Sequence, residues 1–387
     1  MSRIDGGITA PTGFRAAGIA CGVKPSGVRD IALLVSDRPT TSGLVDTTSA
    51  LPSAPVQRNR TIDRAAIRAV LVNSGKANAA TGSVGLEDAH TMGERAARLL
   101  DIPARQVAVC STGTIGERVE LNLVGPGIDT AVRALSPGGA AHFGQAICTT
   151  DRAPKGGAFR LSLEGGPVTI GAAAKGAGMI SPNMATMLAY LTTDASVSGA
   201  DLQAITAEAA AAAFNRISID GQMSPSDTLV VIANGDGPPL EGADRERFAA
   251  AVAAICRWLA IQMVKDGEGA EHAVRLQVTG AADASEAQRV ARAIGNSPLV
   301  KTAIFGRDPN WGRISQAVGQ ALAGAGDARE PRVWLDGAPL DDPAAAAVMD
   351  RAEYDLRVDL SRGAEPAELW ISDLTHAYVT LNAEYHT

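Results

Sequence analysis

Short apolar runs bounded by turn residues alternate along the chain with segments of helical periodicity. Such runs predict strands, at residues 31–35, 67–72, 107–110, 228–233, 274–278, 300–305, 332–335 and 377–382. Helical spacing of apolar positions and helix-favouring composition predict helices, over 86–100, 202–214, 246–263 and 285–294. Because the two kinds of element alternate without a strict parallel βαβ rhythm, we expect an α/β fold of the layered α+β type.

Size and composition narrow the class of protein. A chain of 387 residues can form roughly two to three structural units. Hydrophobic residues make up 46% and charged residues 20%, which is typical of a globular protein. The net charge of -7, without long basic runs, argues against nucleic acid as a partner. We find no apolar run of the roughly 18 residues that a bilayer requires, so we expect no membrane span.

Cysteine, histidine and glycine patterns exclude several kinds of site. The four cysteines lie far apart without a Cys-x-x-Cys pair, and no signal-peptide pattern opens the chain, which favours the cytoplasm. The five histidines form no His-Glu-x-x-His pair, so we expect no metal. The glycines at 125–129 lack the last glycine of a dinucleotide loop, and we expect no cofactor.

The segment Lys175-Gly-Ala-Gly-Met-Ile-Ser-Pro-Asn-Met-Ala-Thr-Met-Leu188 sets a hydroxyl residue in a small-residue loop ahead of an apolar run. Threonine becomes a good nucleophile when its own α-amine is free to act as a base, which requires cleavage of the bond before it. Here that bond joins Ala185 to Thr186. Taken alone, the segment is better explained as an ordinary loop that leads into a buried element.

Three other segments carry polar groups suited to catalysis. The turn-like stretch 111–116 follows a predicted strand and could present backbone N–H groups to an oxyanion, or it could be a structural strand-to-helix turn. The stretch 148–151 offers hydroxyls and a carboxylate, or a capped helix start. Glu268 lies between two glycines, as a ligand contact or as a solvated loop residue.

Taken together, the motifs resemble those of a known family. They include Ser111-Thr-Gly-Thr-Ile-Gly116, Lys175-Gly-Ala-Gly-Met179 and Pro182-Asn-Met-Ala-Thr-Met-Leu188, with further matches at 9–18, 72–79, 214–218, 266–269, 296–306 and 308–313. In nearly its whole length the chain is similar to the self-processing ornithine acetyltransferases of arginine biosynthesis, also called bifunctional glutamate N-acetyltransferases. The resemblance implies an αββα sandwich of the N-terminal-nucleophile type with a smaller C-terminal lobe.

The resemblance also implies a mechanism and a set of site residues. The precursor would cleave itself between Ala185 and Thr186, giving an α chain of residues 1–185 and a β chain of residues 186–387. Thr186 would take acetyl from N-acetylornithine and pass it to glutamate, in an assembly of two α and two β chains. The residues that match the family's oxyanion-hole and substrate-contacting positions are Thr112 and Gly113, and Thr149, Lys175, Thr186, Glu268, Asn382 and Thr387. Thr150 adjoins Thr149 as an alternative for that position.

Several positions depart from the family pattern. Gln222, Met223 and Pro225 stand where polar residues are usual, and Lys76 and Arg152 also differ. These departures leave three alternatives open at the level of sequence: a self-processed amidohydrolase or aminopeptidase, an acyltransferase of specialised metabolism with another acceptor, and a ligand-binding protein without activity. The use of acetyl-CoA as a donor is likewise not decided by any local motif.

Overall fold

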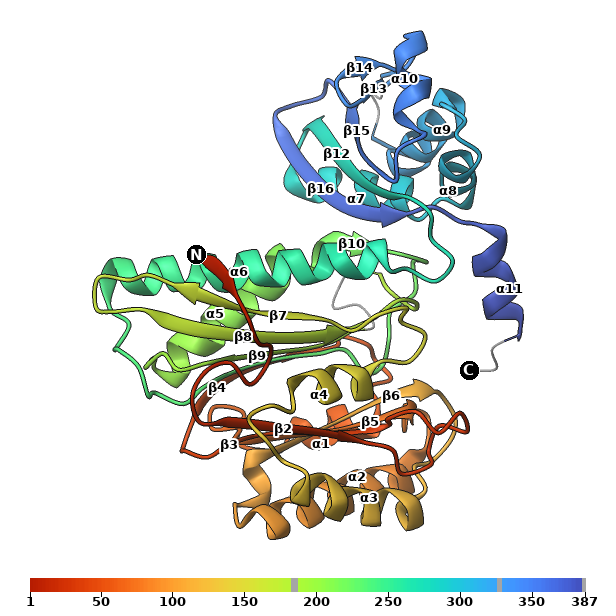
Figure 1. The fold of residues 1–387 in the computed structure, drawn as a ribbon. Helices are drawn as coiled ribbons and strands as arrows, with labels where there is room; N and C mark the ends of the chain where they lie inside the picture. The colour runs from red at the N-terminus through yellow and green to blue at the C-terminus, as the bar shows by residue number, and fades with distance from the viewer. Residues whose placement is uncertain (182–186, 326–328, 385–387) are drawn as a thin grey trace.

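In the computed structural model, which describes residues 1–181, 187–325 and 329–384, a four-layer body carries a smaller C-terminal lobe (Figure 1). The larger sheet of the four-layer body has the strand order β1, β7, β8, β9, β11, β4. Its strands are β1 Ser2–Ile4, β4 Thr41–Asp46, β7 Lys155–Leu161, β8 Val168–Lys175, β9 Leu188–Thr193 and β11 Thr228–Ala233. The smaller sheet, in the order β2, β3, β5, β6, contains β2 Phe14–Ile19, β3 Ile31–Ser36, β5 Ala69–Lys76 and β6 Val107–Thr114.

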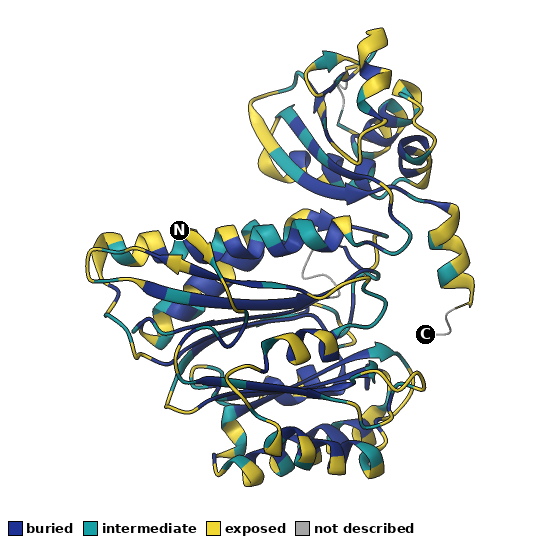
Figure 2. Ribbon diagram, in the orientation of Figure 1, coloured by how far each residue is buried: buried dark blue, intermediate teal, exposed yellow. Residues whose placement is uncertain are grey.

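The two sheets face each other, and helices cover their outer faces. Helices α5 (Gly199–Ala212) and α6 (Gly242–Lys265) pack on the larger sheet, whereas α2 (Gly82–Leu100) and α3 (Leu121–Arg133) pack on the smaller one. Helix α1 (Ala54–Asn59) packs on α2 and β6. Helix α4 (Ala140–Ile147) contributes Phe143 to the core between the sheets, where its ring meets Tyr190 edge to face. This layering confirms the αββα sandwich, and the strands of the two facing sheets consist mostly of buried residues (Figure 2).

The C-terminal lobe has its own sheet and core. The strand order is β10, β16, β12, β15, β13, β14, with β10 Ile217–Ser218, β12 Ala273–Ala281, β13 Arg332–Leu335, β14 Ala338–Pro339, β15 Glu353–Asp359 and β16 Glu365–Ser372. The helices are α7 Ala284–Gly295, α8 Pro298–Phe305, α9 Trp311–Ala321 and α10 Pro343–Val348. After β16, helix α11 (His376–Glu384) leaves the lobe and runs alongside the four-layer body. The smaller C-terminal lobe expected from the resemblance is therefore present.

Two predicted strands are wrong. Residues 300–305 lie in α8, where Ser297 caps the helix by accepting from the Val300 N–H and Pro298 takes the first turn, both of which are helix-start signals. Residues 377–382 lie in α11, at whose start the Thr375 hydroxyl accepts from the Tyr378 N–H at 3.1 Å. In both segments, branched and aromatic side chains suggested a strand, but the capping residues decide the conformation.

Helix α6 corrects the expectation that no apolar run of the chain is long enough to span a bilayer. It is long and apolar enough, by length and composition alone, to cross a membrane. Half of the most apolar stretch of α6 is buried inside the protein. Phe248, Ile255 and Leu259 pack in the core against the outer face of the larger sheet. Helix α6 is apolar because its side chains pack against this sheet, as in a core helix of a globular protein.

A buried lysine joins α8 to β16. Lys301 is 3% exposed, and its Nζ donates to the carbonyl oxygen of Ser372 and, at 3.3 Å, to the Ser372 hydroxyl. Burial lowers the pKa of Lys301 to about 8, although Asp373 and Asp220 act in the opposite direction. The charged form of this lysine is therefore less favourable in the folded protein than in the unfolded chain.

Replacing Lys301 by methionine should remove a pH-dependent part of the stability. Between the folded pKa of about 8 and the ordinary value of 10.5, the unfolded chain binds more protons, so this group makes the wild type more stable as pH rises, by up to about 3 kcal/mol. The melting temperature of the wild type relative to Lys301→Met should increase from pH 8 to pH 10. Lys265→Met, at a partly exposed lysine paired with Glu353, is the control. A pH-independent difference for Lys301→Met would contradict this expectation.

Candidate active site

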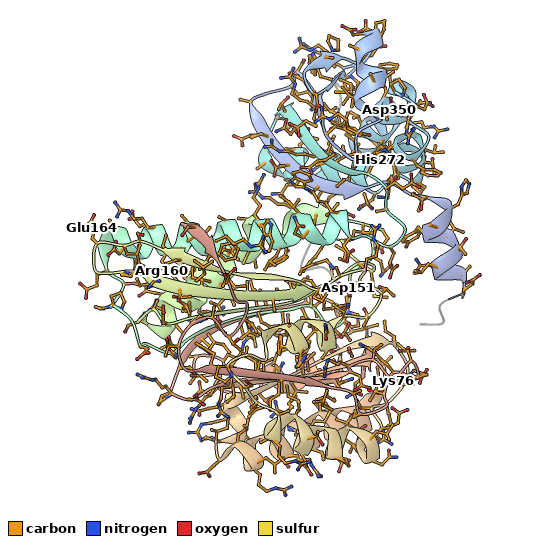
Figure 3. All side chains as sticks on the ribbon, in the orientation of Figure 1. Lys76, Asp151, Arg160, Glu164, His272 and Asp350 are labelled. Carbon is orange, nitrogen blue, oxygen red and sulfur yellow. The ribbon has the colours of Figure 1, made fainter. Side chains whose placement is uncertain are left out.

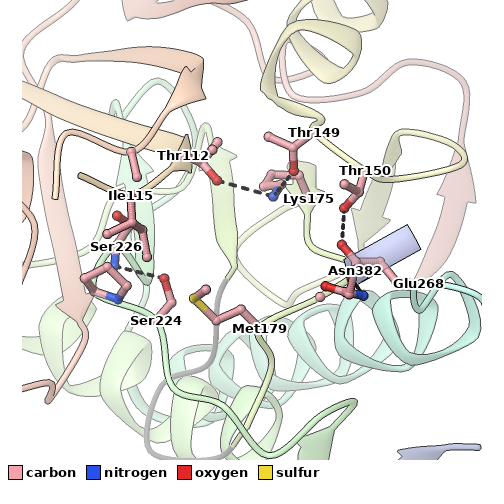
Figure 4. Close-up of a pocket in the computed structure, with 14 residues that line it drawn as sticks. Thr112, Ile115, Thr149, Thr150, Lys175, Met179, Ser224, Ser226, Glu268 and Asn382 are labelled. Carbon is pink, nitrogen blue, oxygen red and sulfur yellow. Dashed lines mark hydrogen bonds between the residues drawn. The ribbon is translucent and has the colours of Figure 1, made fainter. Parts of the chain in front are cut away.

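A pocket of about 90 Å³ opens where the ends of β6 and β8 meet the loops that follow α4 and α6 and helix α11 (Figure 4). Six of the residues selected from the sequence line this pocket, namely Thr112, Gly113, Thr149, Lys175, Glu268 and Asn382. Ala185, Thr186 and Thr387, the other three selected residues, lie outside the described residues. Segments separated by more than 200 residues in the chain thus contribute to one cavity.

Backbone geometry at the end of the smaller sheet requires glycine. Residues 111–114 are the last part of β6 and pair with residues 73–76 of β5, so most of the stretch predicted as a turn at 111–116 extends the strand instead. Gly113 has a φ of +126°, and a Cβ there would lie 2.3 Å from the carbonyl carbon of Gly75. A larger residue at position 113 would separate the two strands and displace Thr112 from the pocket.

Lys175 is the cation of the pocket. Lys175 is the last residue of β8, and it is buried, with 3% of its surface exposed. Its Nζ donates to the hydroxyl of Thr149 at 2.7 Å and to the hydroxyl of Thr112 at 3.3 Å. Figure 4 shows the ammonium group pointing between these two hydroxyls. The lysine therefore connects the residue beside Gly113 with the loop after α4.

A buried carboxylate holds this loop in place. Asp151 accepts from the backbone N–H of Gly176 at 2.7 Å and of Thr149 at 3.0 Å, and from Lys155 Nζ at 2.6 Å. Burial opposes its ionisation, but Lys175 and Lys155 lower its pKa to about 2. Asp151 lies near the end of the larger sheet on the side of α11 (Figure 3). The stretch 148–151 is thus a loop that supports the pocket, and the capped helix start considered for it is wrong.

Glu268 supplies the negative charge. Its Oε1 accepts from the Thr150 hydroxyl at 2.6 Å, and its Oε2 accepts from Asn382 Nδ2 at 3.0 Å. A Cβ at position 178 would lie 2.3 Å from the Glu268 carboxylate, so Gly178 leaves the space that this side chain occupies. Glu268 is a pocket residue held by two neighbours, and a freely solvated loop residue does not describe it.

Sequence reasoning did not single out two aspartates of the 220–228 loop, the half-buried Asp220 and the fully buried Asp227. Asp220 accepts from the N–H groups of Met179 and Ile180, at 2.6 and 2.9 Å, and Asp227 accepts from the N–H of Met187 at 2.9 Å. Burial raises the pKa of both carboxyls. They anchor the chain on either side of residues 182–186, and their partners lie about 40 positions away in the sequence.

The departures from the family pattern occupy two kinds of place. Lys76 pairs with Glu117, and Arg152 pairs with Asp266 at 3.3 Å; neither side chain lines the pocket. Pro225 lines the pocket, and Met223 lies beyond it in an adjoining groove. Changes at 222–225 therefore alter the immediate surroundings of the pocket, whereas those at 76 and 152 do not.

A layered α/β body whose pocket combines hydroxyls, one lysine and one glutamate defines a small-molecule enzyme. Residues 15–387 match the ArgJ family, and the chain belongs to this family. This membership confirms the resemblance stated from the sequence motifs. In the described parts of the chain, no group of three or more His, Cys, Asp or Glu side chains is placed to hold a metal ion.

Relatives are similar over their full lengths. The arginine biosynthesis bifunctional protein ArgJ of Synechocystis is 41% identical, over 99% of this chain and 98% of that protein. The protein of the same name from Bacillus subtilis is 37% identical, over 100% and 98%. Among solved structures, the ornithine acetyltransferase of Mycobacterium tuberculosis complexed with ornithine is 38% identical, with a TM-score of 0.42, and the match covers 47% of this chain and 96% of that one.

Proposed function

We propose that this protein transfers the acetyl group of N-acetylornithine to glutamate through an acetyl ester of Thr186. The family places the enzyme in arginine biosynthesis, with small molecules as its substrates. The observation that carries the proposal is the charge arrangement of the pocket, where Lys175 and Glu268 lie beside the Thr112–Gly113 strand end. N-acetylornithine brings one carboxylate and, on its side chain, one ammonium group, and Lys175 and Glu268 offer a complementary charge for each.

Cleavage between Ala185 and Thr186 would give an α chain of 1–185 and a β chain that begins with Thr186. A free α-amine has an unperturbed pKa of about 7.7 to 8.0, so its neutral form is well populated near neutral pH. This amine would accept the proton of the Thr186 hydroxyl as the oxygen attacks the acetyl carbonyl. Asp220 and Asp227, through the backbone on both sides of this segment, would keep the nucleophile in register with the pocket.

The remaining steps use the same groups twice. Thr112 and Gly113 would stabilise the tetrahedral oxyanion. Its collapse breaks the amide C–N bond, the proton passes from the α-amine to the departing ornithine nitrogen, and the acetyl ester remains. Glutamate then binds with its carboxylate near Lys175, its amine attacks the ester, and the proton returns to the Thr186 oxygen. One site is sufficient because donor and acceptor are both α-amino acids.

We also propose where the enzyme is located in the cell and how its chains assemble. We expect a cytoplasmic protein, since all four cysteines are free, two of them buried, as is usual in reducing compartments. An assembly of two α and two β chains follows the family resemblance. The masses of the denatured chains and of the native assembly would test both the cleavage and the stoichiometry.

Incubation with N-acetylornithine, with and without glutamate, should distinguish transfer from hydrolysis. We expect N-acetylglutamate and ornithine in equal amounts when glutamate is present, and little acetate. Release of acetate at a rate that glutamate does not change would instead identify an amidohydrolase. Acetyl-CoA in place of N-acetylornithine, assayed in parallel, would show whether the same enzyme also accepts a thioester donor.

A further inference from the structure

A second groove adjoins the active-site pocket. It has a volume of about 570 Å³ and is lined by the loop at 49–52, the start of α1, the loop at 79–82, Gln222 and Met223. Ile115 and Pro225 line both the groove and the pocket, so the two cavities adjoin at these two residues. We call this cavity the Met223 groove.

The Met223 groove has no ionisable residue among the described side chains that line it. Its walls are mainly apolar, with Ala50, Leu51, Pro52, Ala80 and Met223, and its polar side chains are the uncharged ones of Ser49, Gln57, Thr81 and Gln222. Leu51 is 82% exposed. An amino-acid carboxylate or ammonium group would lose its hydration there without gaining a charged partner, which is unfavourable. The groove is suited to an uncharged, flexible chain.

The pocket itself sets the direction in which such a chain would run. Lys175 and Glu268 lie at one end, while Ile115, Ser224 and Ser226 lie at the other (Figure 4). With the oxyanion role proposed for Thr112 and Gly113, an N-acyl amino acid that binds its charged groups at the first end would place its acyl carbonyl near Gly113. The alkyl part of the acyl group would then extend toward Ile115 and Pro225, which also line the Met223 groove.

We propose that the Met223 groove receives acyl chains longer than acetyl, so that the enzyme also transfers acyl groups of about four to six carbons between amino acids. This inference rests on the proposed function. The reaction is balanced as for acetyl: the amide C–N bond breaks, the ester bond to Thr186 forms, and the hydroxyl proton leaves with the released amine. Glutamate then takes the acyl group by the reverse sequence.

The leaving group distinguishes this occupant from the arm of a thioester donor. In an acyl thioester, the sulfur and its long arm take the place of the departing ornithine amine, at the Lys175 and Glu268 end of the pocket. The alkyl part of the acyl group remains on the Ile115 side in either donor. An occupant of the Met223 groove is therefore the acyl chain.

The test compares N-acetyl-, N-butanoyl- and N-hexanoylornithine as donors to glutamate. Full burial of one methylene favours binding by about fourfold, and this groove is open on one side. We expect KM to fall with chain length, and kcat/KM for the hexanoyl donor to stay within tenfold of the acetyl value. In Met223→Trp, whose larger side chain narrows the groove, the hexanoyl value should fall at least tenfold while the acetyl value changes less than twofold.

Leu299→Trp, at an exposed position of α8 in the other lobe, is the matched control and should change neither value. Wild-type rejection of butanoyl and hexanoyl donors by more than a hundredfold, with normal acetyl transfer, would overturn the inference and leave the proposed function standing. Failure to transfer acetyl from N-acetylornithine would instead remove the proposed function. If Met223→Trp impairs acetyl-CoA alone, the groove holds the thioester arm and the inference is wrong.

Discussion

Replacing Thr186 by alanine should leave a single uncut chain and lower acetyl transfer by more than about a thousandfold in kcat. Alanine has no hydroxyl to attack the preceding peptide bond, so neither the β-chain amine nor the nucleophile would be produced. Denaturing electrophoresis and intact mass should find two chains in the wild type and one chain of 39.6 kDa in the variant. N-acetylglutamate formation gives the activity.

Thr186→Ser is the matched control for this experiment. Serine keeps the hydroxyl and, after cleavage, the α-amine, so this variant should still be cut and retain measurable transfer. Equal melting temperatures of Thr186→Ala and of the wild type before processing would show that the variant is folded. Its loss of cleavage and of acetyl transfer would then be due to the missing hydroxyl. A Thr186→Ala protein that is cut at the same bond, or that transfers acetyl at the wild-type rate, would exclude Thr186 as the nucleophile.

Local patterns predicted most of the core and less of its edges. The apolar run at 228–233 corresponds to β11 without any shift, because a buried strand must be apolar on both faces. The polar residues at 73–76 and 111–114 gave no such signal, yet they extend β5 and β6. Parallel pairing between strands about 40 residues apart fixes their conformation, and no local property of either segment contains that information.

The residues of the candidate site also divide into those that the sequence predicted and those that only the fold reveals. Family motifs selected Lys175 and Glu268, and both line the pocket. Asp220 and Asp227 escaped notice because their partners are backbone N–H groups of a distant loop, which leave no trace in residue spacing. The Met223 groove escaped notice for another reason: its walls come from four loops and helix α1, and only the fold brings them together.

Replacing Thr112 by valine should lower kcat by about a hundred- to a thousandfold, with little change in KM. The Thr112 hydroxyl accepts from Lys175, so its own proton is free for donation to an oxyanion. Valine fills the same space in a site that is 4% exposed, and it removes only the hydroxyl. An oxyanion develops during the reaction and is absent from the bound substrate. Loss of the Thr112 hydroxyl that stabilises it therefore lowers kcat rather than raising KM.

Thr149→Val is the matched control, since the hydroxyl of Thr149 also accepts from Lys175, at 2.7 Å. Both variants deprive the lysine of one neighbour, but only Thr112 adjoins Gly113 at the end of β6. We expect Thr149→Val to raise KM for the amino-acid substrates, through a less well-held Lys175, and to leave kcat within tenfold. Steady-state kinetics with N-acetylornithine and glutamate would measure both constants. Equal losses of kcat in the two variants would mean that Thr112 acts only by positioning Lys175, and the oxyanion role would then be wrong.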